Sequence, residues 1–145
     1  MGVRRMDHVG VIVDNPDAAI AFFAELGLEE AGRGRVDGEW VDRIVGLGGV
    51  ENEFAFVKTP DGHGRLELIQ FRTPPADGGG QPLPANTLGL RHLAFVVDDV
   101  DASVAALQAH GGELVGTLEN YRDIFRLCYI RGPAGIIVEL AQALR

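Results

Sequence analysis

Residues 90–101, LRHLAFVVDDVD, repeat a stretch that the chain has already used at residues 6–17, MDHVGVIVDNPD. The two copies align His8 with His92 and Asp14 with Asp98. In each copy one His stands in an otherwise apolar run, and a helical pattern follows. A match of this length indicates one supersecondary unit used twice.

The two halves also end alike. The first half ends in GRLELIQF around Glu67, and the second in GIIVELAQ around Glu139. Both stretches are apolar apart from their charged and amide residues, which is typical of buried strands. Each half therefore supplies one His from its first strand and one Glu from its last.

The composition limits the classes of function. A chain of 145 residues is long enough for one domain with a real core, so we expect a single domain over 1–145. The net charge of −8 disfavours nucleic acid and anionic membrane surfaces as partners. A single cysteine, no apolar leader and no stretch long enough to span a bilayer predict a cytoplasmic protein.

The pattern predicts the order β-α-β-β-β twice, and hence an α+β fold. Helices are expected after Asn15, which caps a helix begun by Pro16, and over Val100–His110. Trp40–Leu47 is expected to be irregular. Strands are expected at Arg4–Val13, Glu29–Val36, Glu53–Thr59, Gly64–Phe71, Leu90–Val97, Glu113–Val115, Phe125–Arg131 and Ala134–Ala141.

A stretch rich in proline and glycine separates the two halves. Residues 73–87 contain PPADGGGQPLP and show no hydrophobic period, which is typical of a linker. We therefore expect a first module over residues 4–72 and a second over residues 88–142.

The repeated His and Glu residues form a candidate metal site. If the halves pair by pseudo-symmetry, His8, Glu67, His92 and Glu139 converge in one cleft. Two imidazoles and two carboxylates suit a divalent ion such as Ni, Zn, Co, Mn or Fe. One such residue alone is more often structural. A carboxylate twice in register within an apolar strand is costly unless it has a partner, and this favours the metal site.

The motifs DHVGVIV, RLELIQF, LRHLAFVVDDVDA and YIRGPAGIIVEL resemble those of the vicinal oxygen chelate superfamily. That superfamily includes glyoxalase I, methylmalonyl-CoA epimerase, extradiol dioxygenases and bleomycin- or fosfomycin-resistance proteins. The resemblance implies two modules whose sheets curve into a half-barrel around a central metal cleft. It implies metal ligands at His8, Glu67, His92 and Glu139.

Within the superfamily, the order His, Glu, His, Glu resembles bacterial glyoxalase I most. The epimerases usually have Gln where Glu67 stands. Extradiol dioxygenases use His, His and Glu and have a Tyr that corresponds to Tyr129, but their catalytic His has no counterpart here. A drug-binding resistance protein without catalysis is the alternative from another class, although such proteins have usually lost the metal residues.

The resemblance implies a lyase or isomerase that transfers a proton next to a carbonyl through a metal-bound enediolate. The substrate would offer two vicinal oxygens to the ion, and Glu139, or else Glu67, would be the base. Ile12 and Phe71 replace the Arg and Asn that hold glutathione in glyoxalase I, so a glutathione adduct is not the expected substrate.

Other residues are candidates for the substrate pocket, and family members with two modules are commonly dimers. We therefore expect a homodimer and leave open whether one chain or two supply the four ligands. The candidates for the pocket are Trp40, Tyr121, Arg122, Arg126, Cys128 and Tyr129.

Overall fold

The structure, a computed structural model, describes residues 1–78 and 81–145. It divides into two compact units, unit 1 (Met1–Asp77) and unit 2 (Gly78–Arg145). The boundary falls within residues 73–87, and the part of this predicted linker at residues 79–80 lies outside the described residues. None of the helices in the described ranges has the length and apolar character needed to cross a membrane.

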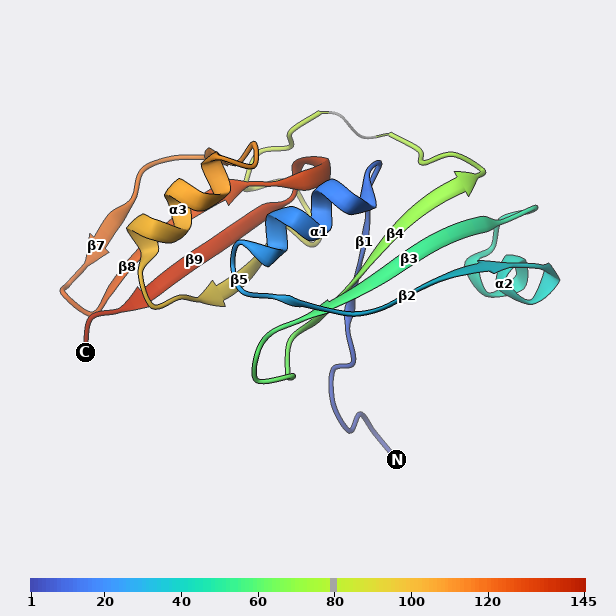
Figure 1. Cartoon of the computed structure of the whole chain (residues 1–145), viewed down its shortest axis with the longest axis horizontal. Helices are drawn as coiled ribbons and strands as arrows, with labels where there is room; N and C mark the ends of the chain where they lie inside the picture. The colour runs from blue at the N-terminus through green and yellow to red at the C-terminus, as the bar shows by residue number, and fades with distance from the viewer. Residues whose placement is uncertain (79–80) are drawn as a thin grey trace. The chain divides into compact units, whose positions relative to one another are not determined.

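Unit 1 folds one four-stranded sheet with two helices (Figure 1). The strands lie in the order β1-β4-β3-β2, with β1 parallel to β4 and the other pairs antiparallel. The elements are β1 (Val9–Ile12), α1 (Pro16–Ala24), β2 (Glu29–Asp37), α2 (Glu39–Val45), β3 (Glu51–Lys58) and β4 (Arg65–Thr73).

Unit 2 repeats this order around α3. Its sheet runs β5-β9-β8-β6, with β5 parallel to β9, and β7 also pairs with β8. The elements are β5 (His92–Val96), α3 (Val100–Gln108), β6 (Glu113–Leu114), β7 (Glu119–Tyr121), β8 (Phe125–Arg131), a short 3₁₀ helix (Pro133–Gly135) and β9 (Ile137–Ala143). The predicted α+β class is confirmed.

Both long helices begin where their sequences predict, and α3 ends at Gln108, two residues before its predicted end at His110. The side chain of Asn15 accepts a hydrogen bond from the backbone N–H of Ala18 at 3.1 Å, and Asp99 accepts one from Ala102 at 3.0 Å. After each helix a glycine adopts positive φ, +87° at Gly27 and +86° at Gly111. Each helix therefore has a defined length and returns the chain to its sheet.

In each unit the helix covers one face of the sheet and forms the core there. In unit 1, Phe22 and Phe23 of α1 are at most 1% exposed and lie over the face that carries Leu68. In unit 2, Leu107 of α3 and Leu140 of β9 are both fully buried on the corresponding face. Because side chains alternate along a strand, residues between these core positions point to the opposite face. The predicted His and Glu residues belong to that opposite face.

Several predicted boundaries are wrong. The first strand covers only Val9–Ile12, and because β4 begins at Arg65, residues 4–7 have no strand residue opposite them. Trp40–Leu47 is not irregular throughout, since α2 occupies most of it. The last strand begins at Ile137 rather than Ala134, which has a φ of 55° in the preceding 3₁₀ turn. Strand β7 was not predicted.

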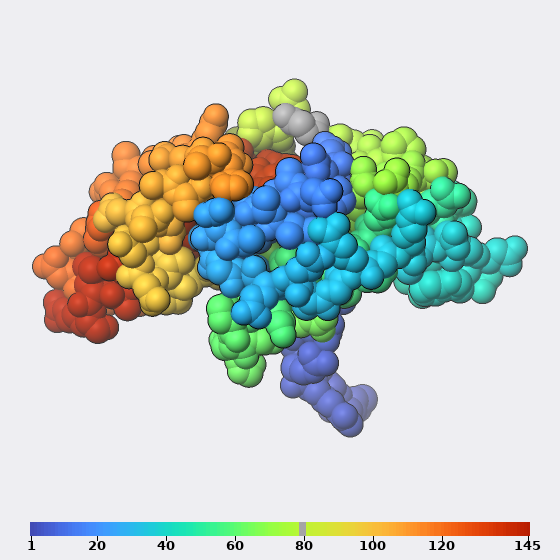
Figure 2. Space-filling model, viewed as in Figure 1, coloured from blue at the N-terminus to red at the C-terminus, as the bar shows by residue number. Residues whose placement is uncertain are grey.

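The N-terminal residues extend from unit 1, as the dark blue segment of Figure 2 shows. Met1, Val3 and Met6 are all highly exposed. His8 lies at the base of this segment, directly before β1.

Candidate metal and substrate site

In unit 1 the strand register brings His8 and Glu67 together. Glu67 lies between Gly10 of β1 and Phe56 of β3, and His8 stands two residues before Gly10 on the same face. The Nε2 atom of His8 and the Oε1 atom of Glu67 are 3.9 Å apart. This distance is too long for a hydrogen bond, so neither atom satisfies the other. Two ligands each about 2.1 Å from one ion at a tetrahedral angle lie about 3.4 Å apart, so the pair would close by about 0.5 Å to share a metal ion.

The other ring nitrogen of His8 has a partner that the sequence analysis missed. Nδ1 of His8 lies 2.7 Å from Oδ2 of Asp7. That hydrogen bond, with Arg5 and Arg65 nearby, holds the pKa of Asp7 below its usual value, so the carboxylate accepts and Nδ1 donates. In the neutral imidazole with this hydrogen bond, the lone pair is on Nε2, toward Glu67. A carboxylate that orients a histidine in this way is typical of metal sites.

An aromatic ring flanks the unit 1 pair. The rings of Phe56 and His8 meet edge to face, with 5.3 Å between centroids and an interplanar angle of 89°. The guanidinium of Arg65 lies 4.6 Å from the centroid of the same ring. Phe56 limits how far the imidazole can turn, so it helps to fix His8 beside Glu67.

Unit 2 repeats the same row of residues. Glu139 lies between Ala94 of β5 and Tyr129 of β8, and His92 stands two residues before Ala94. Tyr129 therefore corresponds to Phe56, and its ring lies 5.0 Å from that of His92. The register of the His and the Glu on their strands is the same in both units.

Each unit presents one His–Glu pair. Across residues 1–78 and 81–145, no group of three or more His, Cys, Asp or Glu side chains is arranged to hold a metal ion. The signal for the aromatic positions was present in the sequence, since Phe56 and Tyr129 alternate with core residues of their strands. The sequence alone could not show that these rings lie beside the Glu residues, because that depends on the pairing of β3 with β4 and of β8 with β9.

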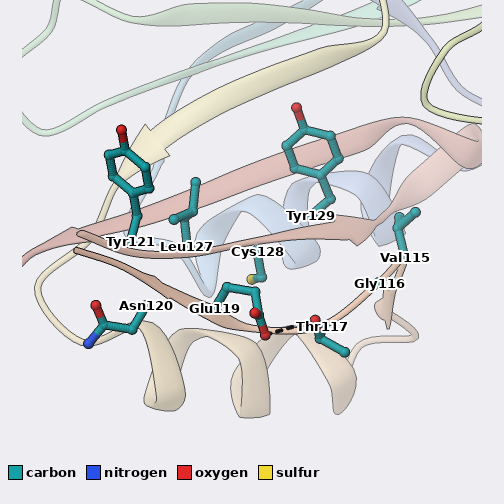
Figure 3. Close-up of a pocket in the computed structure, with 9 residues that line it drawn as sticks. All are labelled: Val115, Gly116, Thr117, Glu119, Asn120, Tyr121, Leu127, Cys128 and Tyr129. Carbon is teal, nitrogen blue, oxygen red and sulfur yellow. Dashed lines mark hydrogen bonds between the residues drawn. The ribbon is translucent and has the colours of Figure 1, made fainter. Parts of the chain in front are cut away.

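An open cavity of about 570 Å³ lies in unit 2 along β7 and β8 (Figure 3). Its lining is mostly apolar, and one lining residue, Tyr129, has its ring 5.0 Å from the ring of His92. Figure 3 shows Tyr121, Leu127 and Tyr129 on one side of the β7–β8 pair and Cys128 on the other. Three of the predicted pocket residues line this cavity: Tyr121, Cys128 and Tyr129.

The other predicted pocket residues lie elsewhere in their units. Trp40 is on α2, which follows the end of β2 at Asp37, and Asp37 is five residues, roughly 17 Å along the strand, from Gly32 in the row of Glu67. Arg126 pairs with Asp101 of α3, which raises the pKa of the guanidinium. Arg122 lies over the ring of Tyr121, 5.3 Å from its centroid. Burial raises the pKa of the Cys128 thiol, so it remains protonated at neutral pH.

The profile of the Glyoxalase/Bleomycin resistance protein/Dioxygenase superfamily matches residues 7–129. The chain belongs to this superfamily. A solved glyoxalase family protein from Bacillus cereus is 46% identical, with a TM-score of 0.95, and the match covers 100% of this chain and 97% of that one. The Bacillus subtilis protein YwbC is 31% identical over 142 residues, 96% of this chain and 98% of its own.

More distant members of the superfamily share the fold. A variant of the fosfomycin resistance protein FosX from Listeria monocytogenes is 16% identical, with a TM-score of 0.61 and coverage of 96% of this chain and 90% of that one. That structure was solved with Mn(II) and 1S,2S-dihydroxypropylphosphonic acid. At this identity the likeness is one of fold alone.

Proposed function

We propose that the chain is a metal-dependent enzyme of the glyoxalase I type, a lyase or isomerase that moves a proton next to a carbonyl group. The observation that carries this proposal is the repeated register, in which a His and a Glu occupy equivalent positions in both units. A structural role for one such pair would not require a second pair in the same register.

His8, Glu67, His92 and Glu139 would hold the ion, with one pair from each unit. The pairs belong either to one chain or to two chains of a homodimer. Two imidazoles and two carboxylates suit Ni, Zn, Co, Mn or Fe, and the Mn(II) bound by FosX is in keeping with this donor set. When bound, such an ion supplies a Lewis acid for two vicinal oxygens of a small substrate.

Glu139 is the base in this proposal. Two residues before it on the same face stands Ile137, whereas Arg65 stands at the equivalent position before Glu67. Ile137 gives Glu139 an apolar neighbour on this face, whereas Glu67 has a cationic one, and we assign the proton transfer to the carboxylate in the more apolar surroundings. Glu139 takes the proton from the carbon next to the carbonyl and returns it to the neighbouring carbon, while Glu67 remains the steadier ligand.

The substrate is not a glutathione adduct in this proposal. Ile12, which replaces the glyoxalase I arginine, is 41% exposed on the same face as Gly10. An isoleucine cannot pair with a carboxylate of glutathione. The mostly apolar cavity beside Tyr129 instead suits the carbon chain of a smaller molecule.

Metal content and turnover of matched variants test the proposal. We expect the purified protein to hold a divalent metal and to turn over one of a set of α-hydroxy ketones, hemithioacetals and acyl-CoA thioesters. Glu139→Gln should keep most of the metal and lose turnover by a factor on the order of 10²–10⁴. Glu67→Gln should cost less, and Glu29→Gln, an exposed control, should change neither.

Two results would contradict parts of the proposal. If Glu67→Gln is inactive and Glu139→Gln active, the roles of the carboxylates are reversed. If His8→Ala combined with His92→Ala leaves the metal content unchanged, the ion does not bind at these residues.

A further inference from the structure

A second cavity, of about 370 Å³, lies in unit 2 at the start of β5 and β9. Arg91 and Arg131 line it together with apolar side chains that include Leu83 and Ile137. Among its described lining residues none is acidic. Two guanidinium groups thus share a pocket without a carboxylate, in a chain whose net charge is −8.

One of these guanidinium groups has a buried donor without a partner. Nε of Arg91 is buried and makes no hydrogen bond within the described residues. Arg131 donates from Nη1 to the backbone oxygen of Gly135 at 2.9 Å, which fixes the guanidinium at the cavity wall. A buried charged donor that lacks an acceptor is unfavourable, so an acceptor from outside the chain is expected there.

Unit 1 offers an internal comparison, because the repeat differs at this point. The position of Arg91 is occupied in unit 1 by Asp7. There the neighbouring cations are neutralised, with Arg5 2.8 Å and Arg65 3.7 Å from the carboxylate of Asp7. The shared strand register therefore does not itself require an arginine here, and Arg91, whose Nε has no partner among the described residues, needs its own explanation.

We propose that Arg91 and Arg131 form a binding site for an oxyanion, the carboxylate or phosphate of a small organic molecule. The planar fork of a guanidinium matches both groups through paired N–H donors. The apolar wall around Leu83 and Ile137 accommodates a short carbon chain beside the charge. The volume is at the lower end of that found for small-molecule sites.

The position of the oxyanion site also indicates the substrate class, a step that rests on the proposed function. Arg131 follows Tyr129 by two residues on the same face of β8, and Ile137 precedes Glu139 in the same way on β9. Two residues along a strand correspond to roughly 7 Å. A substrate that presents vicinal oxygens to His92 and Glu139 would thus place an acidic group a few bonds away at Arg131.

Titration of the arginine Nε–H resonances by nuclear magnetic resonance tests the site directly. The probes are inorganic phosphate, butyrate and neutral butyramide, each added at constant ionic strength. We expect the Arg91 and Arg131 signals to shift saturably with butyrate or phosphate and not with butyramide. The stronger of the two anions identifies the group as a carboxylate or a phosphate.

Variants then assign the effect to these side chains. Arg91→Gln and Arg131→Gln should each weaken anion binding at least about tenfold. Arg91→Lys, which keeps the charge and protects against loss of fold, should weaken it less. The control Arg43→Gln changes an exposed arginine of unit 1 that pairs with Glu39 and should have no effect. Equal binding of butyrate and butyramide, or unchanged anion affinity in both glutamine variants, would overturn the proposal.

Metal content of the same variants separates this inference from the proposed function. We expect Arg91→Gln and Arg131→Gln to retain their metal. A protein that binds metal through His8 and His92 but shows no anion binding refutes the oxyanion site alone. A protein that binds the anion at Arg91 and Arg131 but no metal refutes the proposed function and leaves the oxyanion site intact.

Discussion

The contact between Asp7 and His8 gives a sharp test of the metal site. Replacing Asp7 with Asn preserves the shape of the side chain and removes its charge. In the wild type, Asp7 fixes the proton of His8 on Nδ1 through a contact of 2.7 Å and so keeps Nε2 free for a metal. Loss of such a partner usually weakens metal binding by about 10- to 100-fold.

The exposure of this contact sets the expected size of the effect. The side chains of His8 and Asp7 are 34% and 46% exposed, so water competes for the hydrogen bond. We therefore expect a loss near the lower limit, roughly tenfold in metal affinity. The midpoint of urea unfolding should not change, because exposed ion pairs contribute little to stability.

Competition with a chromophoric chelator at pH 7.5 measures the apparent Kd for zinc. Asp17→Asn is the matched control, since Asp17 pairs with Arg33 at 2.9 Å on the surface of the same unit. The hydrogen bond with His8, followed by the charges of Arg5 and Arg65, lowers the pKa of Asp7 from 3.8. Asp7 is thus ionised at pH 7.5, so Asp7→Asn removes a full charge under the conditions of the assay.

One result would refute this reasoning. If Asp7→Asn binds zinc as tightly as the wild type while His8→Ala does not bind it, then Asp7 does not orient the ligand. If His8→Ala also binds zinc normally, the error lies in the metal site itself.

Three further predictions concern the fold, the cysteine and the assembly. Leu68→Ala, at a fully buried position of β4, should lower the free energy of unfolding by about 2–5 kcal/mol in urea titrations, and a loss below about 1 kcal/mol would show that the site can collapse. Burial raises the pKa of Cys128, so iodoacetamide at pH 7.5 should alkylate the native protein far more slowly than the urea-unfolded chain, and equal rates would contradict the buried position. Light scattering at micromolar concentration should give the mass of a homodimer, because the exposed side chains of Trp40 and Ile44 on α2 offer apolar surface for an interface. The mass of a monomer would contradict this prediction.

The parts of the fold that could be predicted are those in which a residue type strongly prefers one local conformation. Asn15 before Pro16 marks a helix start, and Gly27 marks its end, because an amide side chain can cap the helix and glycine readily takes positive φ. The repeated His and Glu residues could also be predicted, because they appear as identical residues when the two copies are aligned. These features depend on local sequence alone.

The elements that were missed depend on contacts far along the chain. Helix α2 has one buried residue, Val41, so its hydrophobic period is weak. Asp42 supports the following turn by accepting hydrogen bonds from the backbone of Gly49 at 3.0 Å and Val50 at 2.7 Å. Strand β7 is fully exposed and polar, and its strand character comes from pairing with β8 across a turn in which the Asn120 side chain accepts from the backbone of Asp123 at 2.8 Å.

The site was predicted least well where the two copies differ. Alignment of the repeat draws attention to identical residues, whereas Asp7 and Arg91 occupy the same position with opposite charge. In unit 1 the group at that position has partners within the chain, since the carboxylate of Asp7 accepts a hydrogen bond from Nδ1 of His8 and pairs with the nearby arginines. In unit 2 it leaves a guanidinium whose Nε has no acceptor among the described residues. The two proposals give each half the same ligand pair, one His and one Glu. They give the neighbouring residue different roles: Asp7 of unit 1 orients a metal ligand, and Arg91 of unit 2 binds the charged group of the substrate. Exchange of the two charges, Asp7→Arg with Arg91→Asp, should then impair metal affinity through unit 1 and anion affinity through unit 2, and loss of only one would break the link between them.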